Sequence, residues 1–335
     1  MKKLIVAVAA LAMLTGSAYA AEWNFYGNAR VSTFYADKDI ADTTNLEMGV
    51  QSNSRIGAKI KVSDELTANF EYGTGVNVRH LYGEWNFGAG KLLVGQTWNP
   101  YWMSVSNQVY ATDLGLGGIG ENYAGRSAQI RLTFGDFVLA FVEPDLTVYD
   151  AAGDTFDGDE VKFPKIQAKY TYRADMWNAG IAGSYQTFDV EEESVDSWAV
   201  AATVRLTMDN FGLRAQAWTG TNTGNIAATD AGSDFGAGYA VYEAGKVYDV
   251  DAMGFALIAE MKINDMFSVE AGYGYVELEA SDDSDMDDEA QSYYLQVPIT
   301  LAPGVYIIPE VGVIDYKETG QEETTYYGAK WQINF

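Results

Sequence analysis

The sequence predicts an all-β protein, a sixteen-stranded antiparallel transmembrane β-barrel with short periplasmic turns and long external loops. Three observations lead to this fold. Apolar and polar residues alternate along much of the chain, as they do in strands with two different faces. Many alternating segments reach about 10 to 13 residues, whereas the strands of globular proteins usually have about 5 or 6. The connections between segments alternate between short and long, which is the pattern of outer-membrane barrels.

The barrel domain is expected to span 21–335, because the first twenty residues have the features of a secretion signal. A basic start precedes the apolar run 4–14, and an A-x-A pattern ends at Ala20. These features predict a signal peptide, 1–20, cleaved between Ala20 and Ala21. The apolar run is shorter than the roughly 20 residues that a membrane-spanning helix needs. The sequence contains no cysteine, so no disulfide framework is expected.

The first predicted strand shows the two faces clearly. Trp23, Phe25 and Val31 share one face, while Asn24 and Arg30 share the other. An antiparallel sandwich also alternates, but it has no reason to combine long strands with this rhythm of connections. The sixteen predicted strands are 23–35, 47–62, 65–73, 78–88, 90–98, 126–135, 136–144, 162–173, 176–188, 196–208, 210–220, 251–263, 267–280, 290–300, 304–316 and 324–335.

Tight turns follow the even-numbered strands, and mostly longer connections follow the odd-numbered ones. The turns are rich in Asp, Asn and Gly, as at Ser63-Asp64 and Gly135-Asp136, because these residues favour turn conformations. The longest connection is 221–250. Closure of the sheet satisfies the backbone hydrogen bonds of every strand in lipid, so a closed barrel is expected.

The chain is acidic, with 47 Asp and Glu residues against 21 Lys and Arg residues. The predicted external loops carry most of the acidic residues and, among the basic ones, only Lys38, Lys246 and Lys317. The acidic tract 282–289 lacks the central glycine of a calcium-binding loop, so no metal site is predicted. Solvated loop charge and a diffuse divalent-cation site that bridges lipopolysaccharide are both left open.

Basic side chains in the strands are expected to face the lumen, because Lys or Arg on the lipid face costs about 2–4 kcal/mol at mid-bilayer. At Arg79 the alternation slips between Val78 and Leu81, which suggests a β-bulge. The predicted lumen-lining bases are Lys59, Lys61, Lys165, Lys169, Arg205, Arg214, Lys262 and Lys330, together with Arg30, Arg55 and Arg131.

Other motifs indicate no enzymatic chemistry. The single histidine, His80, would have to serve any Ser-His or Asp-His pair, so neither an enzyme nor a cofactor is predicted, and no nucleic-acid partner is expected. The GxGxxG pattern at 115–120 lacks the preceding strand and following helix of a dinucleotide site. The many Tyr and Trp residues are typical of aromatic girdles. The alternative is a sugar-stacking track made of Trp98, Tyr101, Trp102 and Tyr110.

The last predicted strand ends on an aromatic residue. Its apolar face includes Tyr327, Trp331, Ile333 and Phe335. This segment resembles the terminal strand of Gram-negative outer-membrane proteins, which serves as the signal for the outer-membrane assembly machinery. The resemblance implies that these four residues form the assembly signal.

The segments Asn53–Gly75, Leu81–Thr97 and Ser106–Tyr110 resemble the homotrimeric outer-membrane porins of sulfate-reducing bacteria. The close resemblance covers roughly 50–140, and the architecture continues to the C-terminus. It implies a homotrimer of water-filled pores, embedded in outer-membrane lipid and lipopolysaccharide, that pass ions and small polar solutes by passive diffusion. The outward-facing Gly27, Ala29 and Gly83 would allow close packing between protomers. A substrate-selective channel and a non-conducting structural or adhesive barrel are the alternatives.

In sixteen-stranded general porins the third long loop folds into the lumen and sets the narrowest part of the pore. By resemblance, loop 99–125 would do so here, with Asp113 and Glu121 as its carboxylates. The candidate bases on the opposite wall are Arg30, Arg55, Arg79 and Arg131. A surface loop without a role in the pore is the alternative. Acidic loops and a partly basic lumen predict weak ion selectivity that changes with salt concentration.

Overall fold

The computed structural model of the chain describes residues 21–39, 41, 43–150, 153–232, 238–281, 287–317 and 323–335. The predicted signal peptide and most of the acidic tract 282–289 lie outside these residues. Within the described ranges, no helix is both long and apolar enough to cross a membrane.

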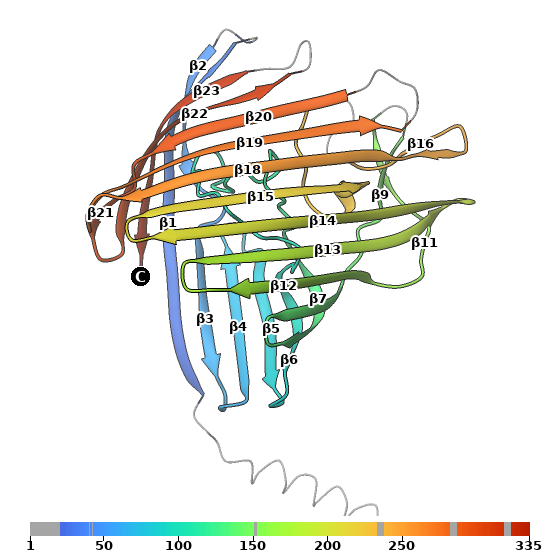
Figure 1. Cartoon of the computed structure of the whole chain (residues 1–335), viewed down its shortest axis with the longest axis horizontal. Helices are drawn as coiled ribbons and strands as arrows, with labels where there is room; N and C mark the ends of the chain where they lie inside the picture. The colour runs from blue at the N-terminus through green and yellow to red at the C-terminus, as the bar shows by residue number, and fades with distance from the viewer. Residues whose placement is uncertain are drawn as a thin grey trace, which may run out of the picture.

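Antiparallel strands form one large sheet that closes on itself (Figure 1). Its strands are β1 (Glu22–Lys38), β2 (Thr43–Val50), β3 (Arg55–Lys61), β4 (Leu66–Gly73), β5 (Val78–Asn86), β6 (Lys91–Trp98), β7 (Arg126–Phe134), β8 (Phe137–Val142), β11 (Glu160–Val161), β12 (Lys165–Arg173), β13 (Trp177–Val190), β14 (Glu193–Met208), β15 (Phe211–Thr221), β18 (Val250–Lys262), β19 (Ser268–Ala280), β20 (Asp287–Gln296), β21 (Ile299–Ala302), β22 (Val305–Tyr316) and β23 (Thr324–Asn334). The sheet closes where β1 pairs with β23, from Asn28 opposite Asn334 to Lys38 opposite Thr324.

Three of the barrel strands are interrupted. Both β2 and β3 pair with β1, both β11 and β12 pair with β13, and both β20 and β21 pair with β22. Each interrupted pair is therefore one strand of the barrel. The closed sixteen-stranded antiparallel barrel predicted from the sequence is confirmed.

The alternation places apolar side chains outside and polar ones inside. Phe25, Ile56 and Leu257 are exposed on the outer face, which is the face that lipid covers in a membrane barrel. On the inner face, Gln167 and Gln186 are fully buried. Both are hydrogen bonded to loop backbone, as buried amides require.

Two departures from regular pairing lie near one another in the sequence. The register between β4 and β5 shifts by one residue opposite Arg79, so the bulge expected there is confirmed. Between β2 and β3 the chain leaves the sheet over 51–54, whereas the sequence pattern predicts one continuous strand over 47–62. At this break Gln51 Nε2 donates to the carbonyl of Val109 at 2.9 Å, because a loop occupies the lumen beside it.

A separate four-stranded sheet lies outside the barrel. It contains β10 (Thr155–Asp157), β9 (Thr147–Asp150), β16 (Val241–Glu243) and β17 (Lys246–Tyr248). Figure 1 shows β9 and β16 at the end of the barrel where the long loops lie. Apolar residues of this sheet pack on Phe188, Val190 and Val195 of the barrel strands.

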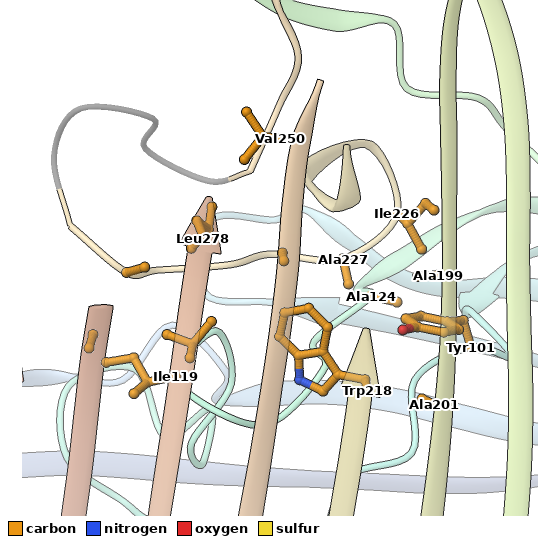
Figure 2. Close-up of a cluster of buried hydrophobic side chains, with 14 of the residues drawn as sticks. Tyr101, Ile119, Ala124, Ala199, Ala201, Trp218, Ile226, Ala227, Val250 and Leu278 are labelled. Atoms are coloured by element: carbon orange, nitrogen blue, oxygen red, sulfur yellow. The ribbon is translucent and has the colours of Figure 1, made fainter. Parts of the chain in front are cut away.

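A hydrophobic core lies inside the barrel, between the wall strands and two loops (Figure 2). Tyr101 and Ile119 come from loop 99–125, and Ile226 comes from segment 222–231. They pack against Trp218 of β15 and Leu278 of β19. We call loop 99–125 and segment 222–231 together the plug. The plug packs on the barrel strands from β13 to β20, which are β13, β14, β15, β18, β19 and β20.

Hydrogen bonds hold the plug together. Trp218 Nε1 donates to the carbonyl of Gly120 at 3.0 Å, and the Ala228 N–H donates to the carbonyl of Tyr123 at 2.8 Å. Gly120 has a φ of 93°, and a Cβ there would lie 2.3 Å from the carbonyl oxygen of Phe255. Only glycine fits this approach, so this part of the GxGxxG pattern serves packing.

Candidate pore constriction

Acidic residues of the wall strands hold the backbone of loop 99–125. Glu310 of β22 accepts the N–H groups of Val109 and Tyr110 at 2.8 and 2.9 Å. Glu270 of β19 accepts the N–H of Asn107 at 3.1 Å. Buried polar groups of the backbone need hydrogen-bond partners, and these two side chains supply them, so Glu310 and Glu270 fix the path of the loop.

Three of the predicted lumen-lining bases also support the plug. Arg205 donates to the carbonyl of Ser104, and Lys165 donates to the carbonyl of Asn225. Arg214 forms an ion pair with Glu270, the same carboxylate that holds the loop. These bases face the interior, as their alternation predicts, but their partners are loop carbonyls or a loop-binding acid.

A cavity of about 670 Å³ remains between the loop and the inner wall, where residues of β1, β3, β5, β6, β7, β19, β20, β22 and β23 line it. Five basic and two acidic residues line it: Arg30, Arg55, Arg79, Arg126 and Lys330, with Asp113 and Glu270. Since the loop and the arginine-bearing wall face one another across this space, it is the candidate constriction of the pore.

Asp113 is the loop carboxylate that meets the wall bases. It forms ion pairs with Arg30 and with Lys330, whose Nζ lies 3.0 Å away, and it accepts Asn53 Nδ2 at 2.8 Å. Its φ of 59° lies in the left-handed region, which Asp adopts more readily than most residues. The structure thus brings Asp113 and Arg30 together, while their effect on permeation stays a prediction.

On the adjacent strands β3 and β5, two arginines share a carboxylate of β4 that was not among the predicted site residues. Arg79 Nε lies 2.7 Å from Glu71, and Arg55 Nη1 lies 3.6 Å from it. The hydroxyl of Tyr26 donates to the other oxygen of Glu71 at 3.0 Å. Two features of the sequence point to this cluster. Glu71 lies at an inward-facing position of β4, and the alternation of β5 is interrupted at Arg79.

Glu121 lies apart from the wall bases, in contrast to the expectation for it. Its side chain is fully buried within the plug, and it accepts the N–H of Ser106 at 2.9 Å. Burial raises the pKa of Glu121 to about 7, because a carboxylate loses its hydration there. The loop turns back on itself between Ser106 and Glu121, so the Glu121 side chain points into the loop and away from the lumen.

The remaining predicted bases lie outside the cavity. Arg131 donates to Gln129 at 2.9 Å and to the carbonyl of Trp98. Lys61 and Lys262 pair at 2.7 Å with Asp64 and Asp265 of the tight turns. Lys59 is exposed, with its Nζ 5.8 Å from the ring centre of Tyr26, and Lys169 is partly buried on β12.

The aromatic residues considered as a sugar track do not form one. Tyr101 is buried in the core of the plug. Tyr110 stacks on Tyr326, with ring centres 3.9 Å apart and planes 7° apart. Of the four, Trp98 and Trp102 adjoin, with ring centres 4.0 Å apart. The four aromatic residues therefore lie in three different places within the barrel.

Arg126 is the cavity base that sequence reasoning did not assign. Its guanidinium carbon lies 3.2 Å from the ring centre of Trp98, and it lines the cavity. Arg126 is the first residue of β7 and pairs with Trp98, the last residue of β6. Alternation is a weak guide at strand ends, where the chain passes into a loop.

A family model described as Gram-negative porin matches residues 7–319 of the sequence. The chain belongs to the Gram-negative porin family. The porin fold is that of an outer-membrane channel for passive diffusion of small solutes, and the family and its fold are those of non-enzymatic channels. The expected outer-membrane location and channel function are thus confirmed.

Solved structures agree with this fold. The outer membrane channel DcaP of Acinetobacter baumannii is 17% identical, with a TM-score of 0.74 over 94% of this chain and 97% of that one. An anion-selective porin from Comamonas acidovorans is 15% identical, with a TM-score of 0.65 over 94% and 100%. OmpF of Salmonella typhi, in complex with daunomycin, is 12% identical, with a TM-score of 0.65 over 93% and 97%. No curated protein sequence matches significantly.

Proposed function

We propose that this porin conducts small solutes with a preference for anions. The observation that carries the proposal is the charge of the cavity, which five basic and two acidic residues line. Asp113 is shared by two of these bases, and Glu270 is paired with Arg214 behind the lining. Partly enclosed charge of one sign raises the local concentration of ions of the opposite sign, so anions are favoured in the narrow part of the pore.

The acidic external loops oppose this preference. Charges in open water act over a Debye length of about 30 Å at 0.01 M salt but only about 3 Å at 1 M. Partly buried pairs are screened much less. We therefore expect the attraction of the loops for cations to weaken first as salt rises, so that the ion selectivity is moderate and changes with salt.

The test is the reversal potential of the purified mature protein in a planar bilayer across a potassium chloride gradient. The proposal expects large stable openings and a reversal potential of the sign that chloride permeation gives. Arg55→Gln is expected to reduce the anion preference. Arg173→Gln is the matched control, because Arg173 pairs with Asp136 and is mostly exposed. Cation preference, or a folded barrel that inserts without conducting, would contradict the proposal.

The proposed assembly is a homotrimer, supported by the resemblance in Asn53–Gly75 and Leu81–Thr97. Ala29 and Gly83 are the small outward-facing residues proposed for contacts between protomers. Gly27 has a different neighbour, since a Cβ there would lie 2.6 Å from the ring of Phe335. Channel openings in groups of three, with the mass of three chains on unheated gels, would support the trimer. Single openings and a monomeric mass would contradict it.

The proposed assembly signal is the exposed aromatic and apolar face at the C-terminus. Tyr327, Trp331, Ile333 and Phe335 are all about half exposed or more. The backbone of Phe335 also exchanges hydrogen bonds with Gly27 at 2.7 and 3.0 Å, which extends the closing pair of strands. Deletion of Phe335 is expected to lower the amount of folded protein in the outer membrane, as measured by heat-modifiable mobility.

A further inference from the structure

Three aromatic rings and one guanidinium gather on the wall of the cavity. The ring centres of Trp98 and Trp102 lie 4.0 Å apart, and Tyr123 lies 5.5 Å from Trp102 with its ring plane turned by 78°. Arg126 covers Trp98 at 3.2 Å. All four residues line the cavity of about 670 Å³. Trp98 ends β6 and Arg126 begins β7, where the two residues pair in the sheet. Trp102 and Tyr123 lie near the two ends of loop 99–125, which brings them beside that pair.

Positive charge at this wall exceeds its counter-charge. Arg55 and Arg79 both use the same oxygen of Glu71, and Tyr26 uses the other. Arg126 forms no ion pair with any residue that the structure describes, and its Nε is buried without a hydrogen-bond partner. Buried or partly buried guanidinium groups that outnumber their carboxylates are costly to hold close together. An entering anion would relieve this cost.

The rings beside these guanidinium groups offer a different kind of contact. Trp102 and Tyr123 are partly exposed and stand nearly perpendicular to one another. Aromatic rings favour offset or edge-to-face contacts with other rings, so the corner between these two rings suits a flat apolar group. A neutral sugar would also contact such rings, but it would leave the charge of the guanidinium groups uncompensated.

We propose that this wall is a binding site for small organic anions with a planar aromatic body. The carboxylate of the solute pairs with Arg126 and Arg79, and the ring of the solute packs against Trp102 and Tyr123. The inference rests on the proposed anion preference and goes beyond it, because it requires saturable binding as well as passage. Binding within the path of the ions would slow permeation while the site is occupied.

The test is the single-channel current of the wild-type protein in potassium chloride with benzoate added. Acetate supplies the charge without the ring, and benzyl alcohol supplies the ring without the charge. Benzoate is expected to reduce the current with a saturating dose dependence, and both partial probes are expected to bind at least about tenfold more weakly. Equal effects of benzoate and acetate, or a current that falls without saturation, would overturn the proposal.

Variants separate the two parts of the site. Arg126→Gln and Trp102→Ala are each expected to weaken benzoate block about tenfold, while Arg173→Gln leaves it unchanged. Heat-modifiable mobility identifies folded barrels, and Trp102→Phe, which keeps a ring, is expected to retain most of the block. Anion preference without benzoate block would remove this inference alone. Cation preference would remove the proposed function as well.

Discussion

Strands in both halves of the barrel alternate in the same way, but one half of the interior is filled by the plug and the other borders the cavity. On the β13–β20 side, small inward residues such as Ala182, Ala199 and Ala252 meet the apolar side chains of the plug. On the β3–β7 side, Arg55 and Arg79 line the cavity. Alanine leaves room beneath it for a loop to pack closely, whereas arginine needs water or a counter-charge. The two halves therefore differ in the size of many inward residues, and the arginines on the filled side, Arg205 and Arg214, contact the carbonyl of Ser104 and Glu270.

Trp218→Ala tests the filled half and has the largest expected effect. Trp218 is 6% exposed and donates to the carbonyl of Gly120. Removing a buried Trp side chain costs about 3–5 kcal/mol, so we expect a loss of that size in the free energy of unfolding. The measurement is urea unfolding in detergent micelles, followed by circular dichroism because the substitution removes a fluorophore.

The matched control for Trp218 is Trp102, a residue of loop 99–125 at the edge of the plug core. Trp102 lines the cavity and is partly exposed, so Trp102→Ala removes fewer packing contacts. It is expected to destabilise the barrel by clearly less than Trp218→Ala. Equal losses for the two variants would mean that the cavity side of the plug is packed as tightly as its core.

Glu121→Gln tests whether the plug is as dry as its packing indicates. Burial raises the pKa of Glu121 to about 7, against an ordinary value of about 4.3. The native state therefore binds a proton that the unfolded state releases, so the free energy of unfolding falls as pH rises from about 4.3 to 7 and levels off above that range. The variant keeps an acceptor for the Ser106 N–H and has no ionisation at this site.

The variant is therefore expected to lose this part of the pH dependence. Above pH 7 it should exceed the wild-type free energy of unfolding by up to about 4 kcal/mol. Urea titrations at pH 5 and pH 8 measure the difference. Parallel pH profiles for the two proteins would place Glu121 in contact with water and contradict a dry plug.

The barrel could be predicted from the sequence because every strand alternates between apolar residues, which face outward, and polar residues, which face inward. The resemblance of loop 99–125 to pore loops also named Asp113 and Arg30 among the candidate residues, but it did not predict that these two residues pair. The contacts of Glu270 and Glu310 with the loop could not be predicted. The alternation is the same whether an inward-facing acidic residue contacts water or a loop backbone. The partner of such a residue belongs to a loop that is distant in the sequence. Alternation within a strand does not indicate which distant segment packs against it.

Asp113→Asn tests the open half and is expected to have the smallest effect. The change removes the counter-charge that Arg30 and Lys330 share, while the amide keeps the size of the side chain. We expect the ratio of anion to cation permeability to rise about twofold, measured as a reversal potential at the same salt gradient. Asp64→Asn is the matched control, because Asp64 pairs with Lys61 at an exposed turn. If the two variants shift selectivity equally, charges at the mouths control permeation, and the difference between the halves concerns packing alone.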